Sequence, residues 1–170
     1  MIRRLLSRKP LPFRAGGCRG ATAVELLTLV VLLSVLAAFA IPGINPIVLR
    51  SRLRGAAWQV AGELRLARQR AVTVKKRFQL CTGECAVSVP PGSYSLERED
   101  GAIGSGNWVN ENGVATRLPL DVAITANATP KFTITGTAAG ATVTLSNLLG
   151  VYNVVVAPSG RVKVCEGACP

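Results

Sequence analysis

The spacing of hydrophobic positions changes twice along the chain and divides it into three parts. Residues 26–49 are 24 consecutive residues without a charge, rich in Leu, Val, Ala and Ile, and about 20 such residues are enough to cross a hydrocarbon core. From Leu53 the apolar residues recur at steps of three and four, which is typical of one face of an amphipathic helix. After Phe78 short β-rich runs replace the helical period. The pattern predicts a helix over about residues 21–74, followed by strands.

The apolar stripe of the second part marks the helix face that is expected to pack on a sheet. Pro42, Gly43 and Pro46 precede it and are expected to kink or interrupt the helix. The residues of the stripe are Leu53, Ala57, Val60, Leu64, Ala67, Ala71 and Val74.

The third part is expected to form an antiparallel sheet or a pair of sheets against the helix, which gives an α+β fold. Turn residues at 90–92, 99–101 and 158–160 separate the runs. Residues 101–113 are expected to form a loop that Trp108 anchors. The nine predicted strands are residues 78–81, 85–89, 93–97, 114–119, 122–125, 131–135, 142–145, 151–156 and 161–165.

The balance of charge adds a class of partner and disfavours an enzyme. The chain has 20 Lys and Arg against nine Asp and Glu, a net charge of +11, and no His. The positive charge points to nucleic acid or an anionic membrane surface. The lack of His removes the commonest general base and the commonest zinc ligand. No Ser or Lys stands in a recognisable nucleophile context, so an enzyme is the least favoured class.

Much of the positive charge lies at the N-terminus. Residues 1–20 contain six cations and no acid, so the positive-inside rule keeps this end in the cytoplasm and the rest of the chain outside. A secretory signal peptide with a weak cleavage site at residues 37–40 is the alternative. Without residues 1–20 the chain has 14 cations against nine acids, a net charge of +5, and nine of these cations lie in residues 50–77.

A lone carboxylate marks the start of the apolar segment. Residues 20–27 read GATAVELL, so Glu25 follows Gly20 by five positions, and the apolar segment reaches Pro42. These landmarks resemble the class III signal of type IV pilins and pseudopilins, a family that most often has Phe where this chain has Ala21. The resemblance implies that a prepilin peptidase cuts after Gly20, that Ala21 becomes the methylated N-terminus, and that Pro42 lies at the helix kink.

The same resemblance gives Glu25 a role in subunit assembly. A carboxylate in an apolar setting is costly and usually functional. In a packed filament the N-terminal amine of a neighbouring subunit can neutralise it and draw the subunits into register. The alternative is a carboxylate that reaches the membrane interface.

The resemblance also implies an organisation for the whole chain. Residues 1–20 would be a removed leader, residues 21–49 a transmembrane or filament-core helix, and residues 50–170 a periplasmic head with a helix to about residue 75. The implied fold is the type IV pilin fold, and the implied location is the bacterial inner membrane, then a pilus or pseudopilus at the cell surface. The implied partners are the prepilin peptidase, other minor and major pilins, the inner-membrane assembly platform and, before assembly, the lipid bilayer.

Four cysteines remain after the leader, in two pairs of C-x3-C spacing. Cys81 with Cys85 and Cys165 with Cys169 could form structural disulfides, bind zinc or act as redox pairs. An even number outside the cytoplasm favours disulfides, and neither a metal nor another cofactor is expected. The turn at residues 82–84 favours local pairing, although four cysteines allow three connectivities.

Features after the apolar segment resemble the FimT/GspH group of minor pilins. They are the helix segment LRLARQRA at residues 64–71, a strand ending in Cys81, a glycine-rich loop with Trp108, and a final hairpin. In FimT members that take part in DNA uptake, a C-terminal Gly-Arg-x-Arg motif contributes to DNA binding. Here the corresponding string is Gly160, Arg161, Val162 and Lys163.

The chemistry of this string fits contact with phosphates. Alternate residues of a strand share a face, so Arg161 and Lys163 are expected to project together while Val162 and Val164 face the core. Two such cations can contact the backbone of double-stranded DNA without reading bases. Help is expected from three cations at the end of the helix, Lys75, Lys76 and Arg77.

These features favour a minor pilin of a type IV pilus that assembles at or primes the pilus tip and binds DNA for uptake in natural transformation. The alternatives are an ordinary solvated strand face and a GspH-like structural pseudopilin of a type II secretion system, which would share the N-terminal features.

Overall fold

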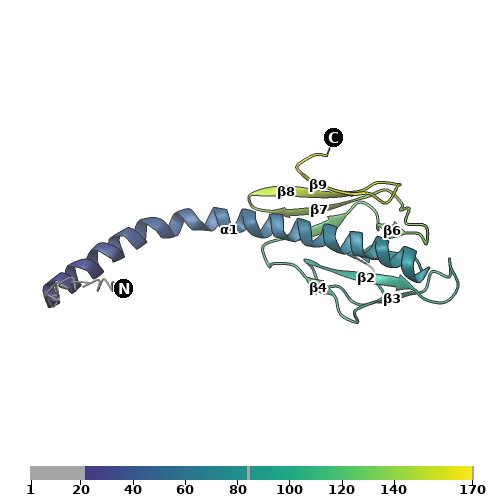
Figure 1. Ribbon diagram of the computed structural model, residues 1–170, viewed down its shortest axis with the longest axis horizontal. Coiled ribbons are helices and arrows are strands. Elements are labelled where there is room, and N and C mark those ends of the chain that lie inside the picture. Colours follow the sequence, from purple (N-terminus) through teal and green to yellow (C-terminus); the bar gives the residue numbers. More distant parts are fainter. Residues whose placement is uncertain (1–21, 84, 170) are drawn as a thin grey trace, which may run out of the picture. The chain divides into compact units, whose positions relative to one another are not determined.

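The computed structural model describes residues 22–83 and 85–169, without the side chains of residues 38–44. The chain divides into two compact units, Met1–Pro42 and Gly43–Pro170. One helix, α1 (Ala23–Val74), contributes residues to both units (Figure 1). The expected cleavage site at Gly20 and Ala21 and the side chain of Pro42 lie outside the described residues.

In the N-terminal unit, α1 begins at a side-chain cap. The backbone N–H of Glu25 donates to Thr22 Oγ1 at 3.3 Å, and the N–H of Leu26 donates to the Thr22 carbonyl at 3.1 Å. The threonine thereby satisfies one of the backbone donors that a helix start leaves without a partner. Glu25 lies in the first turn, where the helix dipole favours a negative charge.

Apolar side chains surround the first half of α1. The large apolar residues between Val24 and Leu36 are 52–71% exposed in the isolated chain. Among the residues that the structure describes, no helix is long and apolar enough to span a membrane.

The second unit contains two antiparallel sheets beside the second half of α1 (Figure 1). In the five-stranded sheet the neighbours are, in order, β3 (Trp108–Asn110), β2 (Ser93–Glu99), β1 (Phe78–Cys81) and β6 (Lys131–Phe132), and β4 (Thr116–Arg117) pairs with β2. In the four-stranded sheet the order is β5 (Ala123–Ala126), β7 (Ala141–Asn147), β8 (Gly150–Val156) and β9 (Val162–Glu166). The α+β class is confirmed.

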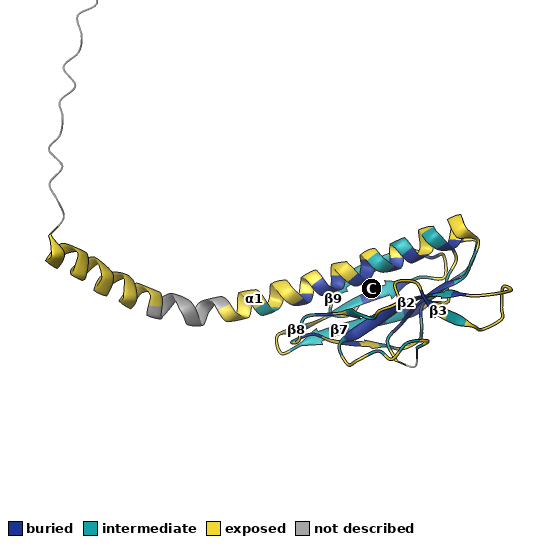
Figure 2. Cartoon of the chain, turned by 90° about the horizontal axis from the view of Figure 1, so that it is seen from below, coloured by how far each residue is buried: buried dark blue, intermediate teal, exposed yellow. Residues whose placement is uncertain are grey.

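One hydrophobic core joins α1 to both sheets. Small and branched residues alternate on the buried helix face, and Figure 2 shows this face turned toward the sheets while the opposite face is exposed. Six of the seven predicted stripe residues are buried, together with Ala56 and Ala61, but Val74 is 50% exposed. Val74 ends α1, and Lys75 follows with a φ of 56° that takes the chain out of the helix.

The second unit contains the whole hydrophobic core of the described residues. The core residues lie between Leu53 and Val164, and the described strands and both disulfides also belong to Gly43–Pro170. The fragment of residues 45–170, here called the head fragment, therefore keeps the complete core and is the natural unit for measurements.

Two strand predictions are wrong. Residues 85–89 form no strand, because Cys85 is tied back to Cys81 and the next amide donates to a side chain, Glu97, instead of to a neighbouring strand. Trp108, expected in a loop, begins β3 and pairs with Glu99 of β2. A strand of three residues among Gly, Asn and Ser carries too little alternation to be recognised from the pattern.

Candidate nucleic-acid interface

The turn between β8 and β9 is closed by backbone hydrogen bonds. The N–H of Gly160 donates to the Ala157 carbonyl at 2.8 Å, and the N–H of Ala157 donates to the Arg161 carbonyl at 2.9 Å. Gly160 has a φ of 77°, a left-handed conformation that L side chains rarely adopt. The turn places Arg161 directly after this glycine and before β9.

Gly160 is also the point where the turn meets two other parts of the head. A Cβ atom at this position would overlap the carbonyl oxygen of Gly136 and lie 2.8 Å from Arg68 Nε. Only glycine fits here without displacing its surroundings. The glycine of the predicted motif is therefore required for packing, whatever the neighbouring cations bind.

Arg68 of α1 holds this turn against the helix. Its Nε donates to the Gly136 carbonyl at 3.0 Å, and its Nη2 donates to the Ser159 carbonyl at 3.2 Å. One guanidinium thus links α1, the β6–β7 connection and the β8–β9 turn. The sequence indicated no such role, because Arg68 is separated from Gly136 by 68 positions and from Ser159 by 91 positions.

Three arginines surround a surface hollow beside this contact. This hollow, here called the arginine hollow, has a volume of about 270 Å³, and no acidic residue lines it. Its lining residues are Arg65, Arg68, Gln69, Gly160, Arg161 and Val162. Arg65 and Arg161 are exposed. The guanidinium of Arg65 also lies 5.7 Å from the ring centroid of Trp58, a cation–π contact that holds it over the helix surface. The hollow offers fixed positive charge to an anion.

The alternation predicted for the final strand is observed. Lys163 is exposed, while Val162 and Val164 are half-buried and pack against the core. Lys163 pairs with Val155 of β8 and points away from the face that Val162 and Val164 share. Arg161, in contrast, lines the arginine hollow. Lys163 is not among the lining residues of the hollow, so the hollow does not bring the two cations of the motif together.

Two of the three cations at the end of α1, Lys76 and Arg77, contact the end of β2 and the loop that follows it. Lys76 Nζ donates to the Gly101 carbonyl at 2.6 Å. Arg77 Nη1 lies 3.3 Å from Glu99 Oε1, and its guanidinium is 5.8 Å from the Trp108 ring centroid. No contact among the described residues joins these side chains, or Lys75, to Arg161 or Lys163. The structure does not bring them into the arginine hollow.

Glu99 is the buried partner that organises this loop. Its side chain is 1% exposed, and its Oε1 accepts hydrogen bonds from the N–H groups of Gly104 at 3.0 Å and Gly106 at 3.2 Å. Burial alone would raise the pKa of Glu99, but the two amides and the charges of Arg77 and Lys76 outweigh it and lower the pKa below its usual 4.5. The carboxylate is therefore held in its charged form.

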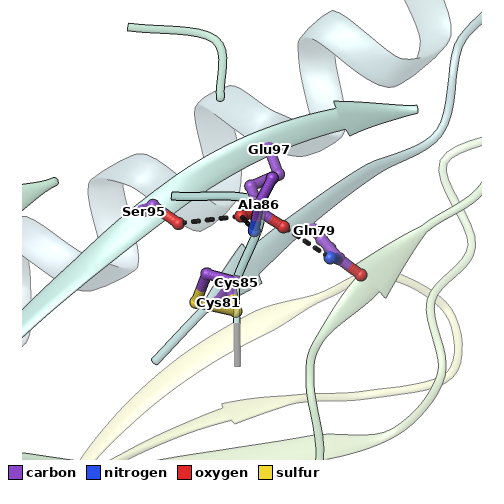
Figure 3. The surroundings of a disulfide bond; sticks show 6 residues. All are labelled: Gln79, Cys81, Cys85, Ala86, Ser95 and Glu97. Atoms are coloured by element: carbon purple, nitrogen blue, oxygen red, sulfur yellow. Dashed lines mark hydrogen bonds between the residues drawn. A yellow bond between two sulfur atoms is a disulfide. The ribbon is translucent and has the colours of Figure 1, made fainter. Parts of the chain in front are cut away.

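The disulfide between Cys81 and Cys85 lies beside a second buried carboxylate (Figure 3). Glu97 is fully buried. It accepts hydrogen bonds from Gln79 Nε2 and the Ala86 N–H, both at 2.7 Å, and from Ser95 Oγ at 3.2 Å. The carboxylate thus fastens the segment after the disulfide to the outer face of β2.

Cys81, Cys85 and Glu97 are of residue types that can bind a metal ion. The two sulfur atoms and a Glu97 carboxylate oxygen lie within 4.8 Å of one another. Both sulfur atoms are joined in the disulfide, and the carboxylate has three donors. These bonds account for the cluster without a metal ion. Cys165 is joined to Cys169 in the same way, so both pairs have the local connectivity that the turn favoured.

The comparisons with known proteins rest on the fold alone. No family model and no curated protein matches the chain. Two solved structures of the minor pseudopilin EpsH from the type 2 secretion system of Vibrio cholerae are similar to this chain over 68% of its length. They are matched over 97% and 96% of their length, with TM-scores of 0.53 and sequence identities of 10% and 9%. The type IV minor pilin FimU of Pseudomonas aeruginosa is matched over 89% of its length, with 16% identity and a TM-score of 0.47. The likeness to the two EpsH structures shows that the chain has a type IV pilin-like fold.

Proposed function

We propose that the chain is a minor pilin that joins a filament through its N-terminal helix and contacts DNA through the arginine hollow. One observation supports the DNA contact. Arg65 and Arg161 are 96 positions apart in the sequence, yet both line one hollow that has no acidic lining residue. Exposed guanidinium groups at fixed positions bind backbone phosphates independently of base sequence.

Each arginine of the hollow has a distinct part in this proposal. Arg161 and Arg65 are exposed and supply the phosphate contacts. Arg68 positions the turn through its bonds to the Gly136 and Ser159 carbonyls. Lys163, which is exposed but does not line the hollow, adds a contact to a neighbouring phosphate as a compact point charge without the bidentate fork of arginine. Lys75 is the only one of the three helix-end cations for which the structure gives no partner among the described residues, and it is assigned a minor role.

The first part of the proposal concerns assembly. A prepilin peptidase removes residues 1–20, Ala21 becomes a methylated N-terminus, and the helix holds the subunit in the inner membrane, with the head in the periplasm, until the assembly platform moves it into a filament. The support is the exposed apolar surface between Val24 and Leu36, which a filament core or lipid would cover. Glu25 in the first helical turn would pair with the N-terminal amine of a neighbouring pilin.

DNA binding is tested by fluorescence anisotropy of a labelled duplex of about 30 base pairs with the head fragment, over about 50–300 mM salt. We expect the logarithm of the binding constant to fall linearly with the logarithm of the salt concentration. The double variant Arg161→Ala/Lys163→Ala should bind more weakly, with the magnitude of the salt slope smaller by about 1.8, because each lost phosphate contact removes about 0.9. Arg65→Ala should lower the slope by about half as much.

The matched control removes two exposed cations elsewhere. Arg50→Ala/Arg117→Ala changes the net charge equally, but neither residue lines the arginine hollow, so its slope should stay close to that of the unchanged fragment. Absence of salt-dependent binding, or equal slopes for the two double variants, would reject the DNA site. The pilin-like fold would then be explained by the alternative, a structural pseudopilin of a type II secretion system.

A further inference from the structure

Two leucines in separate turns of the head are almost fully exposed. Leu148, in the β7–β8 turn, is 94% exposed, and Leu120, in the turn before β5, is 93% exposed. Large apolar side chains at turn tips contribute nothing to the core of the isolated head. Both turns are closed by the backbone and are not loose ends: Asn147 pairs with Gly150, and the Val122 N–H donates to the Pro119 carbonyl at 2.9 Å.

The strand register places both turns at one end of the four-stranded sheet. Ala123, at the start of β5, pairs with Ser146, near the end of β7. The chain reaches Ala123 from Leu120 and leaves Ser146 toward Leu148, so the two leucines lie at the same end of this pair of strands.

Contacts with α1 show which end of the head this is. Asn147 Nδ2 donates to the Leu49 carbonyl at 2.9 Å, and Arg52 Nη1 lies 3.4 Å from Asp121 Oδ1. The leucine turns therefore flank the part of α1 that begins the second unit. Ile47, in the same part of the helix, is 69% exposed.

Arginines lie among these apolar side chains. Arg50, Arg52 and Arg54 are exposed, and Arg50 and Arg54 share the lining of a hollow of about 320 Å³ with Leu149. Arg52 is paired with Asp121, and Glu166 in the same hollow accepts a hydrogen bond from Tyr152 Oη at 3.1 Å. The group is here called the leucine–arginine end, and consists of Ile47, Arg50, Arg52, Arg54, Leu120, Leu148 and Leu149.

We propose that the leucine–arginine end docks on an anionic phospholipid surface. Protruding leucines can enter the boundary between head groups and acyl chains, and nearby arginines can bind lipid phosphates, which is the pairing of apolar and basic groups that holds proteins at a bilayer surface. A protein partner would need a matching surface of about 800 Å² per side, and two separate convex tips favour lipid over such a partner. The proposal depends neither on DNA binding nor on filament assembly.

The test is flotation of the head fragment with vesicles of phosphatidylglycerol and phosphatidylcholine in equal amounts, and with phosphatidylcholine vesicles alone. We expect flotation with the anionic vesicles and little with the neutral ones. Leu148→Ser and Leu120→Ser should each reduce the bound fraction, with about a tenfold lower partition coefficient, because an inserted leucine loses its transfer free energy. Both side chains are outside the core, so thermal unfolding should be unchanged.

The matched control is Ile103→Ser. Ile103 is 58% exposed but lies in the loop that packs near Arg77 at the other end of the helix segment, so this variant should float like the unchanged fragment. Equal flotation of the Leu148 and Ile103 variants would overturn the proposal, as would absence of binding to anionic vesicles. A third outcome would also overturn the proposal: the fragment does not bind vesicles but associates with itself, and Leu148→Ser abolishes this self-association. That result would identify a subunit interface.

Discussion

At the scale of single residues, Gly160 combines a left-handed conformation with the closest packing in the turn. We expect Gly160→Ala to lower the free energy of unfolding of the head fragment by about 3 kcal/mol, because the added methyl group meets the Gly136 carbonyl and Arg68 as well as straining the backbone. Denaturant unfolding measures this loss.

Gly167 provides the control for backbone strain. It has a φ of 70°, but a Cβ atom there would have no neighbour within 4 Å. Gly167→Ala should therefore cost only about 1 kcal/mol, the strain alone. Equal losses for the two variants would show that the close contact around Gly160 has no energetic weight.

Glu99 makes part of the stability of the head dependent on pH. Its folded-state pKa is lowered, so its contribution is complete above its usual value of 4.5 and is lost as the pH falls through the lower folded value. Glu99→Gln should reduce stability at about pH 7 and flatten the acid-side decline. Unfolding curves recorded across the acid range would contradict this if the variant and the unchanged fragment lost stability in parallel.

At the scale of elements, the two disulfides close loops of the same length but differ in surroundings. Closing so short a loop is worth about 2 kcal/mol in the chain-entropy account, and Cys165→Ala/Cys169→Ala should lose about that much. Cys81→Ala/Cys85→Ala should lose more, about 3–4 kcal/mol, because Cys81 is 3% exposed and the adjoining segment covers Glu97. Thermal and denaturant unfolding of both double variants measure these losses. A larger loss for Cys165→Ala/Cys169→Ala than for Cys81→Ala/Cys85→Ala would contradict the prediction.

Elements with strong periodicity could be predicted from the sequence, and short or contact-dependent ones could not. The stripe from Leu53 to Ala71 follows the helical period through many residues, so its burial was predictable. The alternation around Lys163 was also visible. The strand at Trp108 depends on its partner Glu99, and the missing strand after Cys85 depends on Glu97. Neither partner is evident from local pattern.

Part of the candidate site could likewise be predicted from the sequence, and part could not. The turn with Gly160 and Arg161 stands out as a motif, whereas the convergence of Arg65 on it arises from the packing of β9 beside α1. Lys76 and Arg77 were expected beside Arg161 because all are basic. Their actual partners, Glu99 at the end of β2 and Gly101 in the loop after it, lie more than 20 positions away. Charge composition alone does not indicate which residues such cations will contact.

At the scale of the whole molecule, the two units present different surfaces. The N-terminal unit exposes an apolar helix surface from Val24 to Leu36, whereas the unit Gly43–Pro170 has a closed core with cations on its surface. A filament subunit needs both, since the helix must be covered by neighbours or lipid while the head stays solvated. This account requires that residues 1–20 be removed at one defined bond.

The mass of the mature N-terminal peptide, measured on the protein purified from a host with a prepilin peptidase, tests this requirement most directly. The account predicts a chain that begins at Ala21 and carries a methyl group on its amine, and a Gly20→Val variant that stays uncut. An intact N-terminus at Met1 in the unchanged chain, or cleavage at any bond other than that between Gly20 and Ala21, would contradict the proposal that this chain is a processed pilin subunit.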